Sequence, residues 1–217
     1  MKNLQLTAIC TCLTLSTILH ASSRDGIYFG GGLGEVSDQY SSEIKNLPTQ
    51  PQSIHSNNTV ANFFTGYGNT LDNGFYLAGE VGSNYPGHST KFAQLNTTVY
   101  FSNKSNIHDY LTLDVLSGYR FTELWLLYAR TGLSYTHFDS TQSLATIPAT
   151  RRINNNKVGA RVGTGLNYAI TNNLGIGLDY SHTEYQKNHI RFTGYSAHIK
   201  QHIRSNYLGL SVFYTIE

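Results

Sequence analysis

Cysteine is almost absent from this 217-residue chain, and its two cysteines, Cys10 and Cys12, lie close to the N-terminus. That segment has the features of a cleaved export signal, so the mature chain is expected to contain no thiol. The absence of thiols excludes disulfides, zinc–thiolate sites and cysteine nucleophiles. We therefore expect no cofactor and no metal site.

Charge and long apolar runs are also scarce. Charged residues make up 13% of the chain, and its 15 Lys and Arg residues nearly balance its 13 Asp and Glu residues. This balance says little about partners. No nucleic-acid-binding module is recognisable, so we expect no nucleic-acid partner. Beyond the N-terminus, no stretch approaches the roughly 18 consecutive apolar residues of a membrane-spanning helix.

The N-terminus has the organisation of a secretory signal peptide. Lys2 supplies a positive charge, residues 4–19 are largely apolar, and small residues follow at Ala21, Ser22 and Ser23. A short apolar segment at the extreme N-terminus, followed by small residues, is typical of a cleaved signal rather than an anchor. We assign residues 1–23 to the signal peptide, cleaved near Ala21 to Ser23, and residues 24–217 to one domain.

Tyrosine (16) and glycine (20) are frequent, whereas methionine occurs once and proline four times, which favours strands over helices. Eight segments alternate apolar and other residues with a period of two, and each is about long enough to cross a bilayer as a tilted strand. The expected strands are 26–36, 59–69, 74–84, 108–121, 125–137, 156–169, 175–186 and 203–216.

The connections between these segments alternate strictly between short and long. Three are tight turns, at 72–74, 122–124 and 171–174, rich in Asp, Asn and Gly. The other four, near 37–58, 85–107, 138–155 and 187–202, are long and polar. Short periplasmic turns and long extracellular loops are the asymmetry expected of an outer-membrane barrel. The sequence therefore predicts an all-β, eight-stranded, antiparallel, up-and-down transmembrane β-barrel, a multi-pass protein of the bacterial outer membrane.

Every charge in the middle of a predicted strand falls on the face opposite the apolar residues. An Arg facing lipid at the bilayer midplane would cost about 2–4 kcal/mol, so these charges are expected to point into the lumen. An eight-stranded barrel is just wide enough for side chains to fill, so the charges should pair with one another. The predicted lumen network is Glu80, Asp114, Arg120, Arg130, Arg161 and Asp179.

Aromatic residues gather near the strand ends, as in the two interfacial girdles of a membrane barrel. On the turn side we assign Tyr67, Phe75, Phe121, Trp125, Tyr168 and Tyr214 to a girdle. On the loop side we assign Tyr110, Tyr135 and Tyr185.

The chain resembles the small outer-membrane barrels of the OmpA transmembrane-domain, OmpX and Opa type, a family of bacterial surface antigens. The resemblance lies in segments 26–34 (GIYFGGGLG), 113–121 (LDVLSGYRF), 175–183 (GIGLDYSHT) and 206–214 (NYLGLSVFY), and extends over nearly all of the mature chain. It implies a non-enzymatic surface protein with a role in adhesion, host interaction or envelope integrity. The implied partners are outer-membrane lipid and a host-surface or other extracellular ligand bound by the loops.

Two other functions stay open. The charged lumen could form a narrow ion-conducting pathway, which would make the protein a small porin. Some barrels of this size modify lipid A, and His182 and Glu184, with Ser181 between them, have the residue types of a hydrolase with a serine nucleophile. The leading interpretation assigns the chain no catalytic residue.

The third and fourth predicted loops are basic. A basic rim of this kind would attract the phosphates of lipopolysaccharide. The candidate lipopolysaccharide-binding residues are Arg151, Arg152, Lys157, Lys187, Arg191, Lys200 and Arg204.

Overall fold

The computed structural model describes residues 24–45, 52–85, 88–95, 100–144, 149–191 and 198–216. The predicted signal peptide, residues 1–23, lies outside these ranges, so its cleavage stays a prediction. Within the same ranges, no helix has the length and apolar character that a membrane crossing requires.

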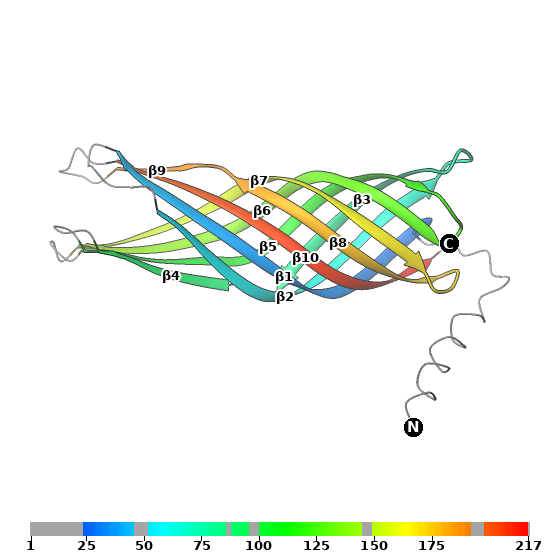
Figure 1. Ribbon diagram of the computed structural model, residues 1–217, viewed down its shortest axis with the longest axis horizontal. Helices are drawn as coiled ribbons and strands as arrows, with labels where there is room; N and C mark the ends of the chain where they lie inside the picture. The colour runs from blue at the N-terminus through cyan, green and yellow to red at the C-terminus, as the bar shows by residue number, and fades with distance from the viewer. Residues whose placement is uncertain are drawn as a thin grey trace, which may run out of the picture.

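The regular elements of the described residues are all strands, which run obliquely along one elongated body (Figure 1). They are β1 (Gly26–Lys45), β2 (Gln52–Thr70), β3 (Phe75–Tyr85), β4 (His88–Leu95), β5 (Tyr100–Arg120), β6 (Trp125–Leu144), β7 (Ala149–Ala169), β8 (Leu174–Tyr185), β9 (Asn188–Arg191) and β10 (His198–Ile216).

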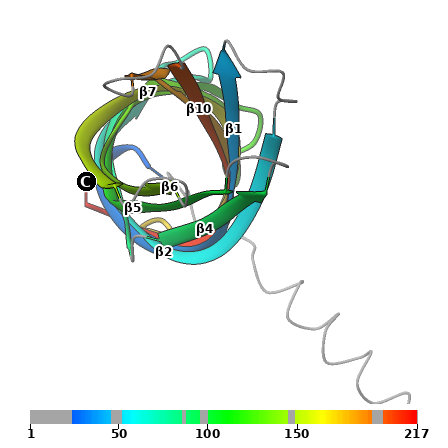
Figure 2. The same cartoon turned by 90° about the vertical axis from the view of Figure 1, so that its left-hand side faces the viewer.

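These strands form one antiparallel sheet that closes on itself, because β1 pairs with β10 as well as with β2. β4 follows β3 beside the same neighbour, β5, and β9 follows β8 beside β10. The described chain thus makes eight barrel strands, which confirms the predicted barrel. Figure 2 shows the closed ring from the end where β4 and β10 lie nearest the viewer.

The register of the ladders determines how far the strands tilt. Paired residues can be followed from Val36 of β1 through β10, β8, β7, β6, β5, β3 and β2 in turn. The path returns to β1 at Gly26, ten residues earlier. A stagger of this size around eight strands implies a tilt of about 40–45° from the barrel axis. Each residue therefore advances about 2.4 Å along that axis.

The two ends of the barrel differ. One end, here called the turn end, carries the tight turns at residues 71–74, 121–124 and 170–173, and the C-terminus of the chain (Figure 1). Gly74 adopts a φ of +83°, a conformation that favours glycine. The hydroxyl groups of Thr122 and Thr171 accept hydrogen bonds from the backbone N–H groups of Leu124 and Leu174. The predicted turns are confirmed, and the opposite end is called the loop end.

An apolar band surrounds the half of the barrel next to the turn end. Outward and inward side chains alternate along each strand, so that Leu33 and Leu210 are each 67% exposed while their neighbours face the lumen. A continuous exposed apolar surface of this size marks a membrane interface. Other outward residues of the band are Ile27, Phe63, Leu77, Leu113, Val115, Leu127, Leu133, Val162, Leu178, Leu208 and Val212.

The apolar band ends well before the strands do. In β10 its outward residues run from Ile216 to Leu208, and the next outward residues are Asn206 and Arg204. Equivalent changes occur on the other strands, where the first polar outward residues beyond the band are Glu35, Thr59, His137, Asn156 and His182. The band is about as tall as the roughly 25 Å apolar band of an outer-membrane barrel.

The predicted strand boundaries at the loop end are wrong. Most of the residues predicted as long connections, at 37–58, 85–107, 138–155 and 187–202, are in strands. The predicted boundaries followed the apolar alternation, which stops where the band stops. Ser, Thr and Asn residues then continue the same ladders. At about 2.4 Å per residue, the strands extend roughly 20 Å beyond the band.

The predicted turn-side girdle lies on the outer surface, but the loop-side girdle is wrong in two of its three residues. Tyr135 faces outward, whereas Tyr110 and Tyr185 are 7% and 3% exposed and lie in the lumen. The reason is the period of two: Tyr110 shares its face with Asp114, and Tyr185 shares its face with Asp179. The turn-side residues Tyr67, Phe75, Phe121 and Tyr214 are exposed, and Trp125 and Tyr168 are half-buried, with their ring centroids 4.7 Å apart.

The position of the apolar band predicts how the barrel tolerates charge. Leu210→Arg should destabilise the barrel by about 2–4 kcal/mol, because the guanidinium would enter the hydrocarbon region. Thr59→Arg, beyond the band, should leave the free energy of unfolding within about 0.5 kcal/mol of the parent value. Urea unfolding in phospholipid vesicles measures both. Equal effects of the two substitutions would contradict the assignment of the band.

Candidate functional site

The lumen is filled by side chains in its turn-end half, starting with Arg24. The guanidinium carbon of Arg24 lies 4.9 Å from the ring centroid of Tyr28, 5.0 Å from that of Phe64 and 4.5 Å from that of Phe213. Its Nη1 atom lies 3.4 Å from Oε2 of Glu80. Arg24 is 0% exposed, so the cation closes the lumen at this end instead of projecting from it.

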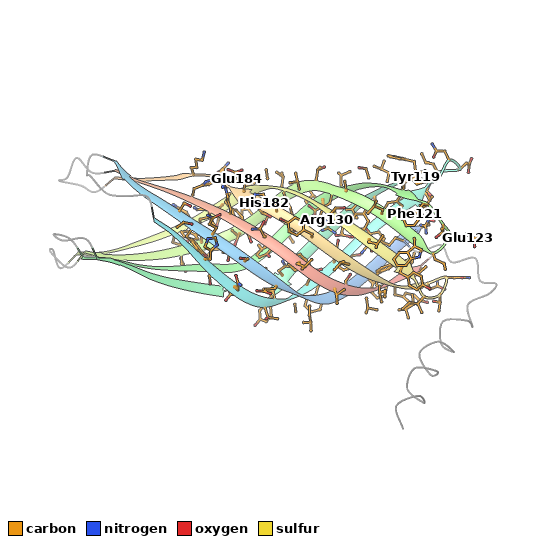
Figure 3. All side chains as sticks on the ribbon, viewed as in Figure 1. Tyr119, Phe121, Glu123, Arg130, His182 and Glu184 are labelled. Atoms are coloured by element: carbon orange, nitrogen blue, oxygen red, sulfur yellow. The ribbon has the colours of Figure 1, made fainter. Side chains whose placement is uncertain are left out.

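Arg130 lies at the centre of the buried charges, in the middle of the barrel (Figure 3). Its guanidinium is 3.2 Å from Oε1 of Glu80, 3.1 Å from Oδ2 of Asp114 and 2.8 Å from Oδ1 of Asp179. Arg161 lies 2.8 Å from the same oxygen of Asp114. With Arg24, the network has three guanidinium groups and three carboxylates, so their charges balance.

The structure brings together five of the six predicted lumen charges. Arg120 is the exception: its Nη2 atom lies 3.2 Å from Oδ2 of Asp25, and its Nε donates a hydrogen bond to the Thr70 hydroxyl. Arg120 follows Asp114 by six residues on β5, which places it about 14 Å nearer the turn end. The sequence predicted that Arg120 faces the lumen but not its height in the barrel. Its predicted inclusion in the network is therefore wrong.

Glycines provide the space for these side chains. A Cβ atom at Gly132 would overlap Oδ1 of Asp114, and one at Gly165 would overlap the ring and hydroxyl of Tyr128. The Tyr128 hydroxyl donates a hydrogen bond to Asp179. Small residues beside large ones therefore let the charges and rings fill a barrel of this width.

A second group of lumen residues lies nearer the loop end. It contains Tyr40, Tyr110, Phe138, Tyr185 and Ile203, all buried. The Tyr185 hydroxyl is 3.2 Å from the Ser134 hydroxyl, and the Asn84 amide donates a hydrogen bond to the Tyr110 hydroxyl. A third group, Val36, Val60 and Tyr207, is also buried in the lumen.

The outer surface of β8 and β10 carries a polar cluster just beyond the apolar band. Oδ1 of Asn206 lies 2.8 Å from Nδ1 of His182, and Nε2 of His202 lies 2.8 Å from Oε1 of Glu184. Burial lowers the pKa of His202, the Glu184 carboxylate opposes this shift, and the charge of Arg204 adds to it.

The predicted basic rim is only partly on the outer surface. Lys187 and Arg204 are exposed, but Lys157 is 3% exposed and points into the lumen, which corrects its assignment to a lipopolysaccharide-binding loop at the rim. Lys157 alternates with the same period as Arg161, so the sequence contained the signal for its lumen position. The side chains of Arg151, Arg152, Arg191 and Lys200 lie outside those that the structure describes.

The candidate hydrolase residues do not come together. Ser181 is 2% exposed and faces the lumen, whereas His182 and Glu184 project from the outer face of β8 in the loop half (Figure 3). Consecutive residues of a strand point to opposite faces, so Ser181 cannot reach His182. This corrects the prediction that Ser181 lies between the other two residues and removes this catalytic set.

Comparison with known proteins identifies the type of barrel. A family model described as the OmpA-like transmembrane domain matches residues 22–212. No curated protein matches the chain. The outer membrane protein OprG of Pseudomonas aeruginosa is similar in structure, with a TM-score of 0.54 and 13% identity over 92% of this chain and 100% of that chain.

Two further solved structures are similar at lower scores. Ail of Yersinia pestis, in complex with the heparin analogue sucrose octasulfate, has a TM-score of 0.41 and 13% identity, over 85% of this chain and 98% of that chain. The outer membrane protease OmpT of Escherichia coli has a TM-score of 0.46 and 10% identity, over 89% of this chain and 97% of that chain. The likeness to OprG shows a shared fold, and the two lower scores carry no argument about function.

Because of its contacts, Arg130 is the lumen residue whose substitution should lower the stability of the barrel most. Arg130→Leu should destabilise the barrel by about 3–5 kcal/mol, because it removes the cation that contacts three buried carboxylates. Arg120→Leu, which affects a partly exposed pair at the turn end, should cost about 1 kcal/mol or less. The measurement is urea unfolding followed by the difference in gel mobility between unheated and heated samples. Unchanged resistance of the Arg130 variant would contradict the network.

Proposed function

Because the chain belongs to the family of OmpA-like transmembrane domains, we propose that it is a non-enzymatic surface protein of a Gram-negative outer membrane. The apolar band anchors it in lipid, and the loop end faces outward and binds an extracellular ligand. The proposed role is adhesion or interaction with a host surface. Export through a cleaved signal peptide at residues 1–23 is part of the same proposal.

The observation that carries this proposal is the length of the strands. β1 continues from the last band residue, Leu33, to Lys45, and β10 begins at His198, ten residues before the band residue Leu208. A barrel needed only to span the bilayer would have strands of about 9–11 residues. The extension instead supports a rigid scaffold that holds the loop end above the lipid headgroups. Binding residues are often found on loops that such a scaffold positions.

The lumen supports this role better than that of a porin. Arg24, Tyr28, Tyr76 and Leu126 are each 0% exposed in the turn-end half, and the charges around Arg130 are paired. Ion conduction would require these side chains to move apart and leave charges unpaired in a narrow lumen. Planar-bilayer recordings should therefore show no steady conductance, and a stable open channel would favour the porin alternative.

The direction of the barrel can be tested with single cysteines, since the chain has none beyond Cys12. A membrane-impermeant maleimide should label Asn57→Cys and Asn156→Cys on intact cells, because both residues are exposed beyond the band. Glu123→Cys, at the opposite end (Figure 3), should be labelled only after the outer membrane is opened. The reverse pattern would contradict the proposed orientation.

The recognition role needs a separate readout. Cells that carry the protein should adhere to host-cell surfaces more strongly than cells that lack it, with equal resistance to detergents and bile salts. Shortening the β1–β2 hairpin by joining Ser37 to Asn57 through an Asn-Gly turn should remove part of this adhesion, while heat-modifiable mobility verifies that the barrel has folded. Loss of detergent resistance without loss of adhesion would instead indicate a role in envelope integrity.

A further inference from the structure

Lys157 lies where β7 loses its neighbour on one side. Gly159 pairs with Tyr185 of β8, and the backbone oxygen of Val158 accepts a hydrogen bond from the N–H of Gln186 at 3.2 Å. Closer to the loop end, the described residues of β9 pair with β10 and not with β7. An open seam therefore begins beside Lys157 and runs between the edges of β7 and β9.

The amine of Lys157 is buried without a hydrogen-bond partner. Its side chain is 3% exposed, and Nζ makes no hydrogen bond to any residue that the structure describes. The centroid of the Phe138 ring lies 4.5 Å from Nζ. Arg130, by comparison, has three carboxylates within 3.2 Å. A buried ammonium group that donates no hydrogen bond is unfavourable, so an anionic ligand here would gain a strong interaction.

Burial lowers the pKa of Lys157 from 10.5 to about 8, and no neighbouring charge contributes to the shift. Lys157 lies beyond the apolar band, since its neighbour Asn156 is exposed and polar. The titratable residues at similar heights on neighbouring strands do not offset the effect of burial on the pKa of Lys157. They are Asp38 and Tyr40 on β1, His137 and Asp139 on β6, Tyr185 on β8 and His202 on β10.

On the turn-end side of Lys157 the lumen is filled. Val36, Val60 and Tyr207 fill the lumen on its turn-end side, and the network around Arg130 lies further along. The apolar band covers only the opposite half of the barrel, so an acyl chain of the bilayer does not reach this height. A ligand at Lys157 therefore comes from the extracellular side.

The charges along the seam are almost all positive. The strand segments 149–158, 184–191 and 198–206 contain one carboxylate, Glu184. Clustered basic residues raise the local concentration of anions. The basic side chains that the structure describes in these segments are Lys157, Lys187 and Arg204.

We propose that Lys157 is the central residue of an anion-binding site at the loop end, which takes a sulfate, phosphate or carboxylate group carried by a saccharide. The ammonium group would donate its N–H groups to the oxyanion, and the rings of Phe138 and Tyr185 would pack against the sugar. This inference rests on the proposed function, because the site opens on the face assigned to recognition.

The energetics of the apo barrel agree with a functional role. A buried, unpaired lysine destabilises a fold, and a methionine of similar length would fill the same space without charge. Proteins keep such unfavourable groups where function requires them. Lys157→Met should therefore raise the urea midpoint of the ligand-free barrel at pH 7, whereas a lysine with a purely structural role would lower it.

The pH dependence of this stability difference follows from the direction of the pKa shift. The folded-state pKa of about 8 lies below the ordinary lysine pKa of 10.5. Between these two pH values the unfolded chain binds the proton more readily, so wild-type stability rises as the pH increases. The advantage of Lys157→Met should accordingly shrink from pH 8 to pH 10.5. An advantage that is constant over this range would contradict the burial of the amine.

Binding is tested with the folded barrel in detergent by isothermal titration calorimetry, using a sulfated disaccharide and a phosphorylated lipopolysaccharide core oligosaccharide. Affinity should fall by about tenfold or more between pH 7 and pH 9.5, because the charge-assisted hydrogen bonds disappear with the proton. Ordinary exposed lysines and arginines stay charged over most of this range and would give little change. Desulfated and dephosphorylated sugars are the ligand controls.

Two variants isolate Lys157. Lys157→Met should weaken binding at pH 7 by about tenfold or more and abolish its pH dependence, whereas the exposed Lys187→Met should keep that dependence. Preference for the sulfated or for the phosphorylated sugar identifies an external glycan or lipopolysaccharide as the source. Equal binding by wild type and Lys157→Met would overturn the site but not the surface role, which depends on the maleimide and adhesion results.

Discussion

Successive residues of each barrel strand must meet opposite requirements, because they point to opposite faces. One face contacts lipid, and the other faces a lumen that eight strands make just wide enough for side chains. The closed ladder from β1 to β10 leaves no hydrogen-bonding edge within the band, as a membrane requires. The apolar band, the buried charges and the glycines beside them all follow from this requirement.

Arg130 shows how the lumen meets its side of the requirement. Its three carboxylate partners come from β3, β5 and β8, so one guanidinium connects strands across the barrel. Arg24 adds a second cation from before the first strand and contacts aromatic rings as well as Glu80. A lumen filled in this way acts as a rigid core and leaves recognition to the loop end.

The sequence was enough to predict which face of a strand a residue occupies, but not its height in the barrel. Alternation placed Asp114, Arg130 and Arg161 in the lumen, where the structure has them. It could not separate Arg120 from them, because height depends on the stagger between strands, a property of the closed sheet. Arg24 was missed since it precedes the first alternating segment, beside the predicted signal peptide.

The errors at the loop end have a different cause. The apolar alternation that identifies a strand in the sequence comes from residues that contact lipid. The strand segments beyond the band have no such alternation, so they were predicted as loops. Tyr110, Tyr185 and Lys157 have another cause: they lie within predicted strands, but they were assigned to the outside although each shares the period of a lumen residue on its own strand. The seam beside Lys157 depends on pairing between β8, β9 and β10, which no local pattern encodes.

In the proposed arrangement, the membrane covers only the turn-end half of the barrel and the strands project beyond it. Spin labels placed in turn at Val212, Leu210, Leu208, Asn206 and Arg204 test this by their collision rates with oxygen and with a water-soluble nickel complex. We expect high oxygen accessibility up to Leu208 and a change to nickel accessibility at Asn206 and Arg204. Lipid-like accessibility continuing to Arg204, or water-like accessibility at Leu210, would contradict this arrangement.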